Sequence, residues 1–257
     1  MTFAGDCEVN YLTLGTLAHF RHLRHLRHFK TLPELKVRAK FRWSMKKSDN
    51  KWALEVIRLL KKEYPGEGSA LNFSNNLELL VAVILSAQST DKQINKITVD
   101  LFRKYRSVED YARADREEFE QDIRSSGFFR NKAKNIIGAA RLIVDEFGGA
   151  IPRTMEELLR LPGVARKTAN IVLYIGFGIT SGIAVDTHVK RLSRKLGLTA
   201  EDNPVKIERD LMDLLPREYW GPTNYLLISH GRTICRAKKT DCGGCVLSHR
   251  CPSAAFL

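Results

Sequence analysis

Leu161-Pro162-Gly163-Val164-Ala165-Arg166-Lys167-Thr168-Ala169-Asn170 is typical of a tight turn that runs straight into a helix. Upstream, Thr154 and Glu157 have the spacing of a capping box, which predicts a short helix before the turn. Pro162-Gly163 ends that helix, because proline cannot continue the helical hydrogen bonds and glycine tolerates positive φ. A second helix is expected from about Ala165. The stretch therefore predicts two helices joined by a hairpin.

The hairpin leaves the backbone N–H groups at the start of the second helix without helical partners. A helix start also carries a partial positive charge, so the two features together favour a bound phosphate. Leu-Pro-Gly on its own is more typical of an ordinary turn between two core helices. The residues that follow the turn must therefore decide between the two interpretations.

Lys167 is expected in the first turn of the second helix, the end at which a cation is disfavoured. Only the neutral amine attacks as a nucleophile, so this placement makes Lys167 a candidate nucleophile; a solvated surface lysine is the alternative. Further along, Val185-Asp186-Thr187-His188 opens another helical pattern, in which Asp186 is expected to be the N-cap. The Asp186 carboxylate could also activate the lysine or stabilise a developing cation.

These motifs resemble the helix-hairpin-helix and the catalytic aspartate of the endonuclease III family of DNA glycosylases. Lys167 and Asp186 match the catalytic pair of that family. Its DNA-binding hairpin corresponds here to Leu161, Pro162, Gly163, Val164 and Ala165. The usual Gly-Val-Gly of the family is Gly-Val-Ala in this chain. Alanine is unfavourable where φ must be positive, so we expect an altered DNA affinity if position 165 needs that conformation.

Two loops resemble the parts of this family that enter damaged DNA. Gln88 follows a strongly apolar helix, and the resemblance places it in the gap left by a flipped nucleotide. Phe128 and Phe129 cannot both face one core from a turn, so one of them is expected to be exposed and suited to stacking between bases. The resemblance assigns this wedge to Phe128. The alternatives are a helix-end hydrogen bond for Gln88 and ordinary packing for Phe128.

Four cysteines near the C-terminus form the second strong motif, with the spacing C-x6-C-x2-C-x5-C: Cys235, Cys242, Cys245 and Cys251. Such density indicates a metal site, and nothing marks a secreted chain in which disulfides would form. Zinc is the alternative, because it prefers C-x-x-C pairs. A compact cluster with a single such pair favours an iron–sulfur cubane, and the spacing is similar to the 4Fe–4S motif of the endonuclease III family. We expect this cluster to have a structural role.

The segment between the first two of these cysteines contains three cations that could bind backbone phosphates: Arg236, Lys238 and Lys239. A solvated basic loop is the alternative. The formal net charge of +13 and the pI near 9.6 likewise favour a polyanionic partner. No run of apolar residues is long enough for a membrane span.

Residues 1–47 differ in composition from the rest, with ten Lys and Arg against three Asp and Glu. They include a three-residue repeat, Arg21-His22-Leu23-Arg24-His25-Leu26-Arg27-His28, which collects leucines on no single helical face. We interpret this segment as a mostly disordered basic arm that adds nonspecific DNA affinity. A His-rich metal tract, an organellar targeting peptide and a true start at Met45 are the alternatives.

The remainder shows one helical pattern after another and no convincing β-hairpins, so we expect an all-α fold. The resemblance implies two helical domains that flank a DNA-binding groove. A six-helix domain with the helix-hairpin-helix would comprise about residues 71–183. An iron–sulfur cluster domain would combine residues 48–70 and 184–257.

The resemblance implies a monomeric, bifunctional DNA glycosylase and abasic-site lyase of base excision repair. Its partner would be double-stranded DNA containing oxidised pyrimidines or abasic sites. A monofunctional mismatch glycosylase and a non-catalytic DNA-binding paralogue are the alternatives. Relatives that act on mispaired adenine lack the lysine and have a glutamate where this chain has Val83, and a mere binder needs no Lys167–Asp186 pair. The location would follow the DNA: the bacterial cytoplasm at the nucleoid, or a eukaryotic nucleus or organelle.

Overall fold

The computed structural model describes residues 50–66 and 68–254. The predictions for the basic segment 1–47 lie outside this range. The described part contains eleven α-helices: α1 (Asn50–Glu63), α2 (Asn76–Leu85), α3 (Asp91–Lys104), α4 (Val108–Arg113), α5 (Arg116–Asp122), α6 (Phe129–Phe147), α7 (Met155–Leu158), α8 (Arg166–Ile171), α9 (Thr187–Lys195), α10 (Pro204–Leu214) and α11 (Trp220–Thr233). Three short helical segments accompany them: the 3-10 turns η1 (Arg124–Ser126) and η3 (Arg217–Tyr219), and the π-helical turn η2 (Val172–Gly176).

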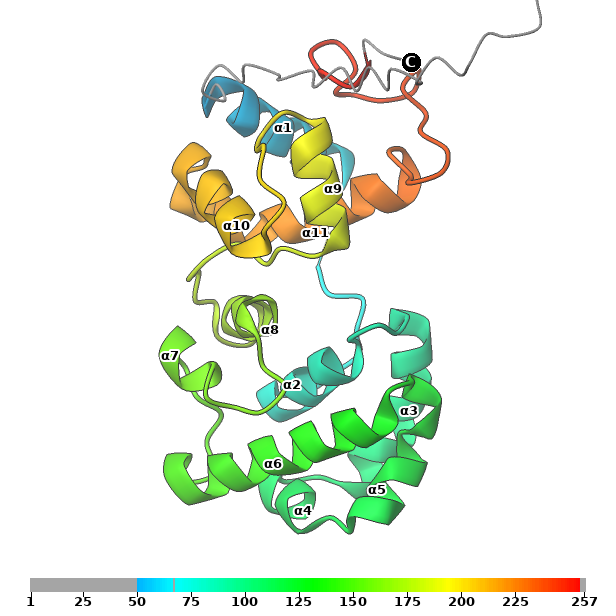
Figure 1. The fold of residues 1–257 in the computed structure, drawn as a ribbon, viewed down its shortest axis with the longest axis vertical. Coiled ribbons are helices and arrows are strands. Elements are labelled where there is room, and N and C mark those ends of the chain that lie inside the picture. Colours follow the sequence, from blue (N-terminus) through cyan, green and yellow to red (C-terminus); the bar gives the residue numbers. More distant parts are fainter. Residues whose placement is uncertain (1–49, 67, 255–257) are drawn as a thin grey trace, which may run out of the picture. The chain divides into compact units, whose positions relative to one another are not determined.

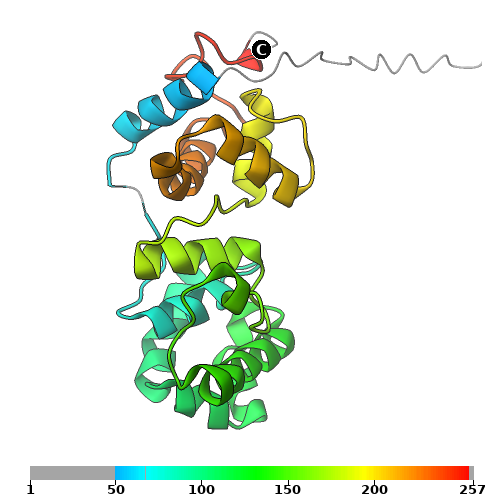
Figure 2. The same ribbon diagram turned by 90° about the vertical axis from the view of Figure 1, so that its left-hand side faces the viewer.

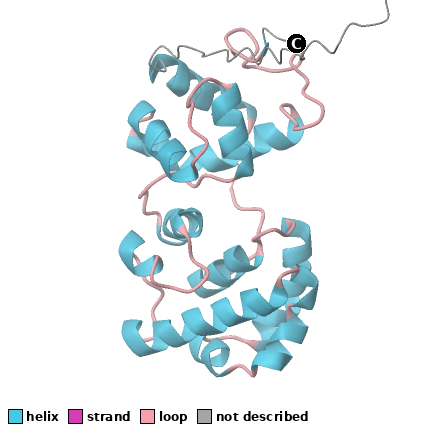
Figure 3. Ribbon diagram, viewed as in Figure 1, coloured by secondary structure: helices cyan, strands magenta, loops and turns pink. Residues whose placement is uncertain are grey.

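The predicted all-α class is confirmed. No β-strand occurs in the described residues, and their one isolated β-bridge pairs Cys235 with Thr240 (Figure 3). None of the helices in this part of the chain is long and apolar enough to cross a membrane.

The described helices build two separate hydrophobic cores. Helices α2 to α8 surround the first core, which begins at Leu71 and ends at Leu173. Helix α1 packs with α9, α10 and α11 around the second core, although α1 lies far from them in sequence (Figures 1 and 2). The predicted division into domains of residues 71–183 and of residues 48–70 with 184–257 stays a prediction.

Helix α2 lies at the centre of the first core, as its sequence suggests. It is apolar all round, and every residue from Leu79 to Leu85 is buried. The Asn75 side chain caps the helix by accepting the backbone N–H of Glu78 at 2.9 Å. The Glu78 carboxylate in turn accepts the backbone N–H and the hydroxyl of Ser74, both at 2.6 Å. These contacts fix the start of the helix whose far end leads into Gln88.

The hairpin forms as predicted, between two short helices. Helix α7 stops at Leu158, and Thr154 caps it by accepting the N–H of Glu157 at 3.2 Å. Gly163 has φ of +81°, and a Cβ there would lie 2.8 Å from Cβ of Asn135, so only glycine fits. Helix α8 gives way after six residues to the π-helical turn η2. Apolar periodicity alone cannot predict this change of winding, because π-turns have no period of their own in so short a segment.

Replacing Leu79 by Ala tests the role of α2 in the first core. Leu79 is fully buried, so the cavity is expected to lower the free energy of unfolding by about 2–5 kcal/mol. Urea unfolding followed by circular dichroism measures the change. Val99→Ala on α3 is the control, because Val99 is 50% exposed and its loss is expected to change stability by less than about 0.5 kcal/mol. Equal losses in both variants would contradict this account of the core.

Candidate functional site

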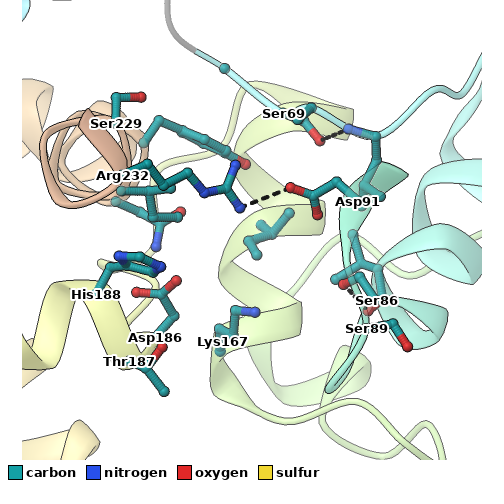
Figure 4. A pocket seen from close by; sticks show the side chains of 18 of the residues that line it. Ser69, Ser86, Ser89, Asp91, Lys167, Asp186, Thr187, His188, Ser229 and Arg232 are labelled. Carbon is teal, nitrogen blue, oxygen red and sulfur yellow. Dashed lines mark hydrogen bonds and ion pairs between the residues drawn. The ribbon is translucent and has the colours of Figure 1, made fainter. Parts of the chain in front are cut away.

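Lys167 and Asp186, which the family resemblance pairs, line one pocket (Figure 4). The pocket has a cavity volume of about 470 Å³, within the range of small-molecule sites. Its walls come from both sets of helices: the end of α2 with the following loop, helix α8, the start of α9 and helix α11. The two candidate catalytic side chains therefore meet although they belong to different elements.

Asp186 is held in place by its own helix. Its Oδ1 accepts the backbone N–H of Val189 at 2.8 Å, so it is the N-cap of α9. Negative charge is favoured at a helix start. One carboxylate oxygen is thus used for capping, and the other remains for a group bound in the pocket. The sequence prediction of an N-cap at this residue is confirmed.

Lys167 lies in the first turn of α8 and is half-buried. Within the described residues its amine makes no hydrogen bond and no ion pair, not even with Asp186. An amine that is held near a carboxylate, yet is not consumed by an ion pair, remains available to attack a bound group. The pocket therefore contains a candidate nucleophile and a candidate base in one place.

A buried ionic cluster fixes the helix that carries Lys167. The Glu208 carboxylate of α10 accepts two hydrogen bonds from Arg166, at 2.8 and 3.0 Å, and one from Asn170 at 2.8 Å. Glu208 is 4% exposed and raises the pKa of the Arg166 guanidinium. Gly182 packs so closely that a Cβ there would collide with the same carboxylate. Because Arg166 and Asn170 flank Lys167, the cluster fixes α8 against the second core.

Gln88 and Phe128 share an unusual backbone conformation. They are the only non-glycine residues with positive φ in the described part of the chain, at 54° and 49°. Such strain costs about 1–3 kcal/mol and tends to cluster at functional sites. Gln88 lines the pocket, and Phe128 is 68% exposed whereas Phe129 packs on the first core. The expected exposure of one phenylalanine is confirmed, and it is Phe128; the roles of both residues in DNA stay predictions.

The hairpin residues lie outside the pocket. Leu161 and Val164 are buried, while Pro162, Gly163 and Ala165 are exposed. Ala165 has φ of −99°, a conformation that alanine adopts without strain. The altered DNA affinity expected from this alanine therefore lacks its physical basis.

Several pocket residues were missed by sequence reasoning. Arg232 of α11 forms an ion pair with Asp91 of α3 at 2.9 Å and so connects the two sets of helices across the pocket (Figure 4). Nothing in the sequence links residues so far apart. His188 also lines the pocket, and its place two residues after Asp186 was a signal that could have been used.

The four cysteines of the C-terminal motif line one cavity, next to α9 and the end of α11. Sulfur is surrounded by donors there: Cys245 Sγ accepts the backbone N–H of Leu247 at 3.4 Å and lies 3.6 Å from His230 Nε2. Arg191 donates to the Cys235 carbonyl at 2.6 Å. Burial raises the pKa of the Cys245 and Cys251 thiols.

No group of three or more His, Cys, Asp or Glu side chains in residues 50–66 and 68–254 is arranged to hold a metal ion. An antiparallel β-bridge between Cys235 and Thr240 closes the basic loop. The three cations of this loop are exposed and do not line the pocket of Lys167.

Comparisons with known proteins agree with this geometry. The model of the HhH-GPD superfamily base excision DNA repair proteins matches residues 81–217. The chain is 55% identical to endonuclease III of Synechocystis sp., over 79% of this chain and 92% of that protein. It is 46% identical to endonuclease III of Bacillus subtilis, over 73% and 86%.

A solved structure of a trapped endonuclease III–DNA covalent intermediate superimposes with a TM-score of 0.75 at 43% identity. That alignment covers 79% of this chain and 95% of the other. The range matched by the family model contains the hairpin, the helix of Lys167 and the N-cap of α9. The chain therefore belongs to the HhH-GPD superfamily of base excision DNA repair proteins and, within it, to the endonuclease III family.

Proposed function

We propose that this protein is a bifunctional DNA glycosylase and abasic-site lyase that removes oxidised pyrimidines from double-stranded DNA. The proposal rests on one observation: the Lys167 amine, which makes no hydrogen bond or ion pair within the described residues, shares a pocket with the Asp186 carboxylate that caps α9. A relative of the same fold forms a covalent complex with DNA, which requires a nucleophile in the protein. The preference for pyrimidines follows the family resemblance.

The chemistry begins when a damaged nucleotide leaves the duplex, which is least costly where damage has already weakened stacking. The Lys167 amine attacks C1′ of the sugar, and the bond to the base breaks with its electron pair going to the base. Asp186 accepts the proton of the attacking amine and stabilises positive charge at the sugar. The sugar ring opens to a Schiff base with Lys167. Its positive nitrogen acidifies the C2′ proton, and loss of that proton expels the 3′ phosphate by β-elimination.

Several exposed groups would bind the DNA during these steps. Gln88 and Phe128 would fill the gap left by the extruded nucleotide. The hairpin from Leu161 to Ala165 would present backbone N–H groups to a phosphate. The cations of the loop at residues 236–239 would contact the backbone, and the charge of +13 would strengthen binding at low salt.

We further propose that Cys235, Cys242, Cys245 and Cys251 hold a 4Fe–4S cluster. The Leu247 N–H donates to Cys245 Sγ, and the Arg191 guanidinium lies 4.0 Å from Cys235 Sγ; donors of this kind stabilise ligating thiolates. When bound, the cluster would supply structural cross-linking rather than chemistry for C–N cleavage, because the cysteine cavity and the Lys167 pocket have no lining residue in common. Ligation would order the tail after α11 and with it the basic loop.

The monofunctional alternative has less support. The position expected to carry a glutamate in adenine-specific relatives is Val83, which lines the pocket and cannot transfer a proton. A non-catalytic binder would not require an uncommitted lysine in the pocket. The protein would act as a monomer wherever DNA lies, at the nucleoid of a bacterium or in a nucleus or organelle.

Borohydride trapping tests the nucleophile. Wild-type protein is expected to form a covalent adduct with a duplex containing one thymine glycol and with an abasic-site duplex, because borohydride reduces the Schiff base. Lys167→Ala is expected to form none, whereas Lys206→Ala, an exposed lysine of α10 outside the pocket, traps like wild type. Trapping on the abasic duplex alone would overturn the pyrimidine assignment. An adduct that persists in Lys167→Ala would overturn the assignment of the nucleophile.

Two variants of Asp186 separate its roles. Asp186→Asn keeps an N-cap and is expected to unfold at the wild-type temperature, but its base release should fall at least about 100-fold because the negative charge is lost. Asp186→Ala loses both functions, and its free energy of unfolding should fall by about 0.5–2 kcal/mol. Thermal unfolding and single-turnover base release measure the two effects. Full activity in Asp186→Asn would show that capping is the only role.

Iron analysis tests the cluster. Wild-type protein is expected to contain about four irons and acid-labile sulfide per chain, and Cys242→Ala to lose most of both. Cys7→Ala is the control, because Cys7 lies outside the motif and should not alter the iron content. Stoichiometric zinc without labile sulfide in freshly prepared wild-type protein would refute the cluster and leave the catalytic proposal intact.

A further inference from the structure

Two loops meet at one buried lysine, Lys132, in the first turn of α6. Its Nζ donates to the Ser126 carbonyl at 2.7 Å and to the Ser89 hydroxyl at 3.0 Å. The Ser89 hydroxyl donates to the same Ser126 oxygen. These three groups form a closed triangle of hydrogen bonds, which joins the loop after α2 to the loop before α6.

The triangle lies next to both strained residues. Ser89 directly follows Gln88, and Ser126 stands two residues before Phe128. The backbone N–H of Lys132 also donates to the Phe128 carbonyl at 3.1 Å. Strained backbone persists only where the surrounding structure over-determines it. The triangle supplies such a restraint to the two loops at once.

Burying the ammonium of Lys132 at this position is energetically unfavourable. It is 4% exposed, and no carboxylate within the described residues forms an ion pair with it. Burial lowers the pKa of Lys132 to about 8, because the charged ammonium is separated from water. An apolar side chain of similar length would fill the same space without that penalty. The presence of lysine is therefore better explained by what its ammonium binds than by stability.

We propose that Lys132 is a positioning residue that holds the loops of Gln88 and Phe128 as one unit, so that both side chains enter damaged DNA together. The inference rests on the proposed function, since it concerns how the protein fills the gap beside an extruded nucleotide. Two independent loops would each lose conformational freedom on binding. A pair that is already joined loses this freedom during folding instead, which favours tighter binding.

A double-mutant cycle tests this coupling without requiring catalysis. The duplex contains a tetrahydrofuran abasic analogue opposite 2-aminopurine, whose fluorescence reports filling of the gap. Gln88→Ala, Phe128→Ala and the double variant are compared in the wild-type and Lys132→Met backgrounds. In the wild-type background the double variant is expected to lose little more affinity than the worse single variant, because the joined loops enter the duplex together and truncating either side chain leaves the gap incompletely filled. In Lys132→Met the two losses should multiply, as they do for independent sites.

Lys132→Met alone should weaken binding to the analogue duplex about tenfold and leave binding to undamaged duplex within about twofold of wild type. Lys134→Met is the matched control: Lys134 is exposed on the same helix, so any effect of its loss should be equal for the two duplexes. Gln93 of α3 also contacts the segment before α6, by donating to the Ser125 hydroxyl at 2.9 Å, and this bond should help Lys132→Met to fold. If that variant does not fold, Ser89→Ala removes the hydroxyl of the triangle. In this background too, the affinity losses of Gln88→Ala and Phe128→Ala should become closer to multiplicative.

The inference would be overturned if the affinity losses of Gln88→Ala and Phe128→Ala were as non-additive in the Lys132→Met and Ser89→Ala backgrounds as in the wild-type background. It would also be overturned if the wild-type protein did not fill the gap. Base release from a thymine-glycol duplex is measured in parallel. A wild-type protein that shows the predicted coupling but releases no base would overturn the proposed function and leave the coupling intact. Normal base release with unchanged non-additivity would overturn the coupling alone.

Discussion

The contact between Glu208 and helix α8 holds the site together. Its carboxylate accepts hydrogen bonds from Arg166 and Asn170, the residues on either side of Lys167 in the same helix. Glu208 belongs to α10 and therefore to the second core, whereas the buried face of α8 belongs to the first. Removing one partner of a buried ion pair leaves an uncompensated charge, so the arrangement tolerates little displacement of α8. The position of the nucleophile thus depends on a contact that none of the reacting groups makes.

The protein uses the start of α9 for two purposes. One carboxylate oxygen of Asp186 caps α9 by accepting the backbone N–H of Val189. The same carboxylate lines the pocket that also contains Lys167. A cap has restricted geometry, so the functional group inherits a fixed orientation without further supporting contacts. The two loops that carry Gln88 and Phe128 are organised differently, because they depend on strained backbone and on hydrogen bonds between the loops. Helix starts thus position the candidate catalytic groups, and the joined loops position the side chains expected to contact DNA.

Much of the fold and part of the site could be predicted from the sequence. Local signals sufficed where one segment determines its own structure, as for the caps by Thr154 and Asp186 and the glycine turn at Gly163. The exposure of one of Phe128 and Phe129 followed from simple exclusion, since two adjacent aromatics could not share one core, and the family resemblance assigned it to Phe128. The pairing of Lys167 with Asp186 came from a family resemblance rather than from spacing.

Sequence reasoning failed wherever residues distant along the chain meet. The Arg232–Asp91 ion pair, the Glu208 cluster and the Lys132 triangle all join separate elements, and each of their residues has an ordinary local context. The π-helical turn η2 was also unpredictable, because its winding depends on what packs around it. The effect expected of Ala165 depended on a positive φ at that position, which the sequence does not reveal, and the observed φ of −99° removes that condition.

The second core has a consequence for the order in which the protein can assemble. It combines α1 with residues that follow Ile183, and Glu55 of α1 contacts Arg250 at 2.6 Å. The first core, in contrast, is built from one uninterrupted stretch of chain. During synthesis from the N-terminus, the first core can therefore form while the second still lacks most of its residues. Until helices α9, α10 and α11 have been synthesised, the apolar face of α1 lacks the residues that bury it in the folded protein.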